Sequence, residues 1–334
     1  MNEPTAAPAP IVVVDTLSKR FGELTAVDGV SFTVAAGEIF GFLGPNGAGK
    51  TTTIKILATL LRATSGRATI AGFDVTREPR RVRESIGLVF QDNSLDDRLT
   101  AWENLYIHAL LYDLPRAAFL ARAENLLRLV DLWDRRDAQV RVYSGGMRRR
   151  LEIARGLLHR PKVFFLDEPT LGLDPQTRNA VWQHVRALRD ANQVTVFMTT
   201  HYMDEAENCN RIAIIDRGSI VALGTPEELK RRVGGDVLVV DAADRPALAA
   251  AVAARYGVAV QVAGDGVRFE VDHGPSFVPR LTADFPEVIL SVAVHRPTLD
   301  DVFLKLTGRA IRDQENSPLD AFRGHVRAFR NRRS

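Results

Sequence analysis

Short apolar runs recur along the first two thirds of the chain and are separated by segments of helical spacing. The apolar runs predict strands at residues 11–17, 30–34, 38–43, 163–166, 194–198 and 212–215. Apolar side chains spaced for one helix face predict a helix over residues 51–61, and residues 97–137 are predicted to be mainly helical with a break at Pro115. Because helical and strand patterns alternate, we expect an α/β fold with a mostly parallel sheet.

The hydrophobic pattern changes after residues 231–234. Apolar runs at 237–240, 258–262, 267–271 and 288–294 alternate with helical patterns at 246–256 and near 277–284, in the order β-α-β-β-α-β. A segment of about 70 residues can fold independently, so this order predicts a small separate α+β domain. We therefore expect four parts: a disordered leader at 1–10, a large domain at 11–232, a small domain at 236–308, and a basic tail at 309–334.

Charge is distributed unevenly along the 334 residues. The formal net charge is +3, but residues 309–334 hold seven Arg against three acidic residues, a net of +4, which leaves about −1 for the remaining 308 residues. The high pI therefore comes from the tail, and the main body is not expected to bind nucleic acid. The sequence contains no run of about 18 apolar residues and residues 1–10 lack a signal-peptide pattern, so we expect neither a membrane span nor secretion.

A glycine-rich segment lies between the predicted strand at 38–43 and the helix that follows. Its glycines allow backbone N–H groups to point inward around phosphate oxygens, and the following helix adds its positive N-terminal end. In such a loop Lys50 would reach the β- and γ-phosphates, and the Thr51 hydroxyl would hold Mg²⁺. The expected nucleotide-binding residues are Gly44, Pro45, Asn46, Gly47, Ala48, Gly49, Lys50, Thr51 and Thr52.

Two adjacent carboxylates follow the apolar run at 163–166. The carboxyl end of a buried strand is where ligands of open α/β sheets bind, so this run would bring Asp167 and Glu168 to the nucleotide. Neighbouring residues on a strand point in opposite directions, which predicts different roles for the two acids. We expect Asp167 to complete the Mg²⁺ ligands and Glu168 to orient or deprotonate the attacking water.

Ser144, Gly145 and Gly146 precede a strongly helical stretch at 147–159. With Ser144 as N-cap, this helix start could receive a second anion. One phosphate loop already engages the triphosphate from one side. A second anion site suggests that two chains enclose nucleotide between them.

Taken together, the phosphate loop, YSGGM, VFFLDE and GLD segments resemble those of ATP-binding-cassette (ABC) ATPases, over roughly residues 11–228. The resemblance implies a P-loop fold with antiparallel β and α-helical subdomains, with ATP and Mg²⁺ as cofactors. It implies that Phe21 stacks on adenine, that Gln91 touches Mg²⁺ and the attacking water, that Asp174 contacts the opposite subunit, and that His201 senses the γ-phosphate. This chain departs from the usual signature at Tyr143 and Met147, and Phe21 stands where Tyr is more common.

Residues 296–308 resemble the terminal motif of daunorubicin-resistance exporter ATPases. That resemblance implies a homodimer of ATPase subunits paired with a separate transmembrane permease at the cytoplasmic face of the membrane, exporting drugs, antibiotics or lipids. The small domain is interpreted as regulatory or dimer-stabilising. An importer ATPase is the alternative, as is an ABC ATPase that acts outside transport. A stand-alone P-loop kinase would leave YSGGM unexplained.

Overall fold

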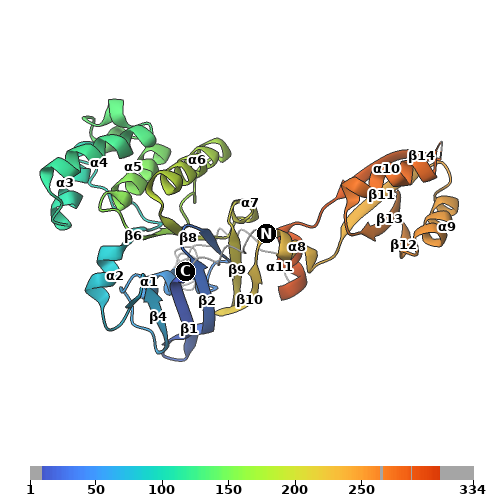
Figure 1. Cartoon of the computed structure of the whole chain (residues 1–334), viewed down its shortest axis with the longest axis horizontal. Helices are drawn as coiled ribbons and strands as arrows, with labels where there is room; N and C mark the ends of the chain where they lie inside the picture. Colours follow the sequence, from blue (N-terminus) through green and yellow to red (C-terminus); the bar gives the residue numbers. More distant parts are fainter. Residues whose placement is uncertain (1–9, 264–265, 287, 309–334) are drawn as a thin grey trace, which may run out of the picture.

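A computed structural model describes residues 10–263, 266–286 and 288–308. The predicted leader, apart from Pro10, and the basic tail lie outside the described residues. Figure 1 shows two bodies, a large one containing the predicted nucleotide-binding segments and a small one formed by residues 236–295.

A six-stranded sheet forms the centre of the large body, in the order β10-β9-β3-β8-β7-β6. Neighbours from β9 to β6 pair in parallel, and β10 is antiparallel to β9. Every residue of β3, β7 and β8 is buried, which explains their continuous apolar runs. The mostly parallel sheet is confirmed. The strands are β3 (Ile39–Leu43), β6 (Ile86–Val89), β7 (Val163–Asp167), β8 (Thr195–Thr200), β9 (Arg211–Asp216) and β10 (Ser219–Gly224).

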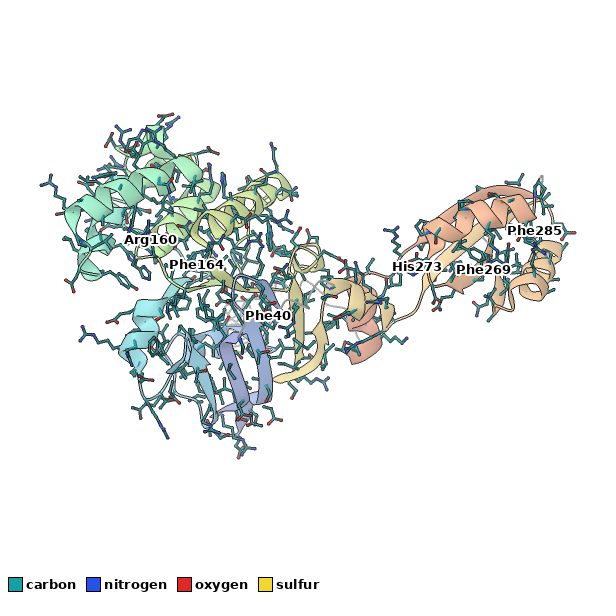
Figure 2. The ribbon with its side chains drawn as sticks, in the orientation of Figure 1. Phe40, Arg160, Phe164, Phe269, His273 and Phe285 are labelled. Carbon is teal, nitrogen blue, oxygen red and sulfur yellow. The ribbon has the colours of Figure 1, made fainter. Side chains whose placement is uncertain are left out.

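An antiparallel sheet of four strands packs against one face of the central sheet, in the order β2-β1-β4-β5. Its strands are β1 (Pro10–Phe21), β2 (Leu24–Ala35), β4 (Ser65–Ile70) and β5 (Phe73–Asp74). Phe32 of this sheet stacks on Phe40 of the central sheet with ring centroids 5.5 Å apart, and Figure 2 places Phe40 inside the large body. The apolar patterns at 11–17 and 30–34 located β1 and β2 but did not reveal β4 and β5.

Helices cover the other side of the central sheet and form a separate lobe. Figure 1 shows α3, α4, α5 and α6 gathered at the end of the large body opposite β1 and β4. Thr100 and Glu103 make a capping box at the start of α3. The helices of the large body are α1 (Lys50–Leu57), α2 (Pro79–Ser85), α3 (Ala101–Leu111), α4 (Arg116–Leu129), α5 (Gly145–Leu157), α6 (Pro175–Asn192), α7 (Met203–Ala206) and α8 (Pro226–Arg231), and short 3₁₀ turns lie at Trp133–Arg135 and Val140–Val142.

The small body has the predicted β-α-β-β-α-β order and a hydrophobic cluster of its own. Its sheet runs β12-β13-β11-β14, and both helices pack on it. Figure 2 shows Phe269 and Phe285 inside this body. Its elements are β11 (Asp236–Ala242), α9 (Arg245–Tyr256), β12 (Val260–Ala263), β13 (Gly266–Val271), α10 (Gly274–Asp284) and β14 (Ile289–His295).

The last described helix, α11 (Leu299–Thr307), leaves the small body and returns to the large one. It contacts α7, α8 and β10, and its apolar side chains Leu299, Val302 and Phe303 are buried in the same cluster as the helical lobe. The expected small domain at 236–308 therefore differs from the structure, because α11 packs with the large body. Sequence patterns offered no reason to separate α11, since an amphipathic helix does not specify which surface it covers.

We expect Phe303→Ala to destabilise the large body by about 3–5 kcal/mol, because Phe303 is fully buried and its removal leaves a cavity. The free energy of unfolding, measured in urea on the full chain, would show the loss. Leu304→Ala on the same helix is the control, because Leu304 is 49% exposed and a surface change of this kind stays within about 0.5 kcal/mol. Equal effects of the two changes would contradict the packing of α11 on the large body.

Candidate functional site

The glycine-rich loop joins the end of β3 to the start of α1, as predicted. A Cβ at Gly44 would lie 2.3 Å from the Ile215 carbonyl oxygen, and one at Gly49 would lie 2.5 Å from the Ala26 oxygen. Gly49 also has a φ of 107°, which L side chains rarely adopt. Tight packing beneath the loop therefore requires glycine at these two positions.

The middle of the loop is open to solvent while its base is buried. Asn46 and Gly47 are exposed, and the buried Lys50 Nζ donates to the carbonyls of Gly44 at 2.7 Å and Pro45 at 3.2 Å. Thr51 and Thr52 are half-buried in the first turn of α1. Lys50 Nζ is thus held at the buried base of the loop by two backbone carbonyls, which a phosphate could replace as hydrogen-bond acceptors.

Asp167 and Thr51 meet beside the loop. Asp167 Oδ1 accepts hydrogen bonds from Thr51 Oγ1 at 3.2 Å and from Thr199 Oγ1 at 2.6 Å. Hydroxyl and carboxylate oxygens are the donors that Mg²⁺ prefers, and Mg²⁺ completes its octahedron with water and substrate phosphates. The donor chemistry of this pair fits the predicted metal.

Glu168 turns away from Asp167 and faces Lys50 and His201. Its carboxylate lies 3.0 Å from Lys50 Nζ and 3.3 Å from His201 Nδ1. Burial alone would raise the pKa of Glu168, but the His201 hydrogen bond and the Lys50 charge outweigh it and lower the pKa to about 2. Glu168 is therefore ionised at neutral pH.

The backbone of Glu168 is strained. Its φ of 47° places it in the left-handed region, which costs about 1–3 kcal/mol for a residue with a Cβ. The Glu168 N–H donates to the Thr199 hydroxyl at 3.0 Å, which helps to hold this conformation. The two acids point to different partners, as predicted, but strand alternation is not the cause, because β7 ends at Asp167 and Glu168 has a positive φ.

Ser144 begins α5 at an exposed position of the helical lobe. Its hydroxyl accepts a hydrogen bond from the Met147 N–H at 3.3 Å, as an N-cap does. Gly145 is exposed, and a Cβ at Gly146 would lie 2.5 Å from Thr177 Cγ2 of α6. Gly146 is thus required by the packing of α5 on α6, a reason that the sequence did not reveal.

Asp174 is the N-cap of α6 and is exposed, as Ser144 is at the start of α5. Its carboxylate accepts from the Thr177 N–H at 3.0 Å, and hydrogen bonds from Thr177 lower its pKa. The structure gives Asp174 a capping role, and its contact with an opposite subunit stays a prediction.

Two predicted residues remain, Gln91 for Mg²⁺ and the attacking water and Phe21 for adenine, and Gln91 is not brought to the acids. Gln91 is exposed beyond the end of β6, and within the described chain no hydrogen bond links its side chain to Thr51, Asp167 or Glu168. Phe21 ends β1 and is 48% exposed, with Lys19 Nζ 4.9 Å from the centre of its ring. An exposed aromatic ring offers a face on which a base can stack, so the role of Phe21 stays a prediction.

Sequence reasoning missed Thr199, which contacts both Asp167 and the Glu168 backbone, and Arg149, whose guanidinium lies beneath the two acids. Thr199 occupies the strand end two residues before His201, and the polar pair Thr199–Thr200 at the end of an apolar run was its available signal. Arg149 had no signal, since it is one of three consecutive arginines.

Comparisons with known proteins agree with this geometry. The ABC transporter family matches residues 27–171. The daunorubicin resistance ATP-binding protein DrrA2 of Streptomyces coeruleorubidus is 43% identical, covering 91% of this chain and 97% of the relative. The Nod factor export ATP-binding protein I of Ralstonia nicotianae is 40% identical, covering 93% and 98%.

A solved structure has the same cassette fold. It is a dimeric ATP-binding cassette in a post-hydrolysis state, bound to ADP and phosphate, with a TM-score of 0.58 and 27% identity over 64% of this chain and 98% of that one. Among the described residues no helix is both long and apolar enough to cross a bilayer. The chain belongs to the ABC transporter family, as an ATP-binding and ATP-hydrolysing subunit.

Proposed function

We propose that this chain powers an exporter for drug-like, antibiotic or lipid-like molecules, and that two copies enclose MgATP between them. The observation that supports the dimer is that the two parts of the expected nucleotide site lie apart within a single chain. The phosphate loop and acids lie at one edge of the sheet, whereas Ser144 is exposed at the start of α5 in the helical lobe. Among the described residues no hydrogen bond joins Ser144 to the loop of its own copy.

In the closed pair, Lys50 of one copy would hold the β- and γ-phosphates, and the α5 start of the other would face the γ-phosphate. Thr51 and Asp167 would hold Mg²⁺, which neutralises phosphate charge. Once Lys50 turns to the phosphates, Glu168 loses its closest cation and becomes more basic, since desolvation raises the pKa of a buried carboxylate. Glu168 would then accept a proton from the attacking water, while His201 would hold the Glu168 carboxylate in place.

Exposed apolar side chains on the helical lobe support a permease as the second partner. Contiguous apolar patches commonly mark protein contacts, and residues on α3 and near the start of α4 supply one here. They are Tyr106, Ile107, Leu110, Leu111, Tyr112 and Leu120. Docking there would place the chain peripherally at the cytoplasmic face of the membrane. Export is favoured over import because the relatives are named for drug resistance and Nod factor export.

Ser144→Arg tests the dimer. In a Glu168→Gln background, which slows hydrolysis, ATP should convert the chain from monomer to dimer in analytical ultracentrifugation. Ser144→Arg should abolish that conversion, because an arginine side chain occupies the space meant for the partner's γ-phosphate. ATP binding to the monomer should persist.

Ala121→Arg is the matched control, because Ala121 is exposed on α4 in the same lobe. This variant should dimerise with ATP like its parent. Dimer formation by the Ser144→Arg chain at the parent's ATP concentration would refute the enclosed-nucleotide arrangement.

A further inference from the structure

A buried arginine lies directly beneath the two acids of the site. Arg149 belongs to α5, five positions after Ser144, and its side chain is 8% exposed. The guanidinium donates to three consecutive carbonyl oxygens, those of Asp167 at 3.3 Å, Glu168 at 3.1 Å and Pro169 at 2.6 Å. The guanidinium thus binds the backbone of the segment that holds the two carboxylates predicted to bind the metal and activate water.

The same guanidinium reaches a second segment. Arg149 Nη1 donates to the Phe90 carbonyl at 2.6 Å, and Phe90 immediately precedes Gln91. One planar group therefore joins the chain that leaves β7 to the chain that leaves β6. Only arginine offers five N–H donors in a fixed plane, so lysine could not make this set of contacts.

Glu152 balances the buried charge of Arg149. Its Oε2 accepts from Arg149 Nη1 at 3.0 Å, and its Oε1 accepts from the Ser94 N–H at 2.8 Å. A buried cation without such a partner would be strongly unfavourable. Glu152 therefore stabilises the Arg149 guanidinium at the position where it donates to the backbone oxygens.

These contacts fix Glu168 from both sides. The Glu168 N–H donates to the hydroxyl and the carbonyl of Thr199, and the Glu168 carbonyl oxygen accepts from Arg149 and from the Leu171 N–H. Since Glu168 lies in the left-handed region at a φ of 47°, these contacts hold its backbone in a strained conformation, and loss of the Arg149 contact would weaken that restraint. The direction of the carboxylate depends on this backbone.

We propose that Arg149 is a positioning residue for ATP hydrolysis, which holds the Glu168 carboxylate in line for the attacking water. The proposal rests on the proposed role of Glu168. Arg149 does not contact the phosphate loop among the described residues, so it sets turnover and leaves nucleotide affinity unchanged.

The main test is the pair Arg149→Met with Glu152→Gln in the full-length chain. This variant removes both charges of the Arg149–Glu152 pair, and the amide oxygen introduced by Glu152→Gln can still accept from the Ser94 N–H, so the fold should persist. ATP hydrolysis measured against ATP concentration should show kcat lower by about 10- to 100-fold, because small misplacements of a reacting group have effects of this size. KM should change by less than about twofold.

Arg150→Gln is the matched control on the same helix. Arg150 donates to the Val130 carbonyl at 2.7 Å, so this change also removes a hydrogen bond to backbone but acts away from the acids. Its kcat and KM should equal those of the parent. Arg149→Lys should give a kcat between those of the parent and of the double variant, because one ammonium group can donate to only some of the carbonyl oxygens that Arg149 contacts.

Combining Arg149→Lys with Glu168→Gln distinguishes a role in positioning Glu168 from a general disturbance of the folded structure. If Arg149 acts through Glu168, the Arg149→Lys change should not lower the residual rate of the Glu168→Gln chain further. A parental kcat in either Arg149 variant, a raised KM at constant kcat, or multiplied losses in the combined variant would each overturn the proposal. Full turnover by Glu168→Gln alone would instead overturn the role of Glu168.

Discussion

Replacing Glu168 with glutamine is expected to lower ATP turnover by about 10²- to 10⁴-fold, the range that general-base catalysis contributes. Glutamine has nearly the same shape but cannot accept the proton of water. Its neutral amide also loses the ion pair with Lys50, whose Nζ lies 3.0 Å from the Glu168 carboxylate. Because ATP still binds, the variant should accumulate as an ATP-loaded dimer.

Phosphate release from full-length protein at saturating ATP measures this loss. Glu124→Gln is the control for a carboxylate-to-amide change, because the Glu124 side chain on α4 is 47% exposed and pairs with Arg128. The control should hydrolyse ATP at the parental rate. A Glu168→Gln chain that retained at least half of that rate would show that another group activates water.

Lys50→Ala is expected to weaken ATP binding by about 10- to 100-fold. A charge-assisted hydrogen bond contributes about 1.5–3 kcal/mol, and each 1.4 kcal/mol changes affinity tenfold. Lys50 is buried at the base of the loop, where burial lowers its pKa although Glu168 and Asp167 act in the opposite direction. Alanine also leaves the Glu168 carboxylate without its closest cation.

Titration calorimetry with ATP measures the affinity. Lys55→Ala removes an exposed lysine from the same helix, and its affinity should match that of the parent. If Lys50→Ala bound ATP as tightly as Lys55→Ala, the loop would not hold phosphate through Lys50.

Local sequence patterns predicted the centre of the fold. The strands β3, β7 and β8 are buried on both faces, so their sequences are continuous apolar runs that stand out without any knowledge of neighbours. The phosphate loop was equally clear, since a strand, a glycine loop and a helix start follow one another in a single segment. Strand β4 was missed because its sequence mixes polar and apolar residues without a clear period, and β5 because it has only two residues.

Contacts between distant segments decided the rest. The sequence by itself predicted nucleotide-binding or catalytic roles for Lys50, Asp167, Glu168 and Ser144, because each lies in a motif formed by adjacent residues. Only the tertiary structure decided that α11 joins the large body, that Gly146 is required by Thr177, and that Arg149 grips the carbonyls beyond Glu168. A carbonyl oxygen is present at every residue, so no sequence pattern can mark which one an arginine 18 or 19 positions away will bind.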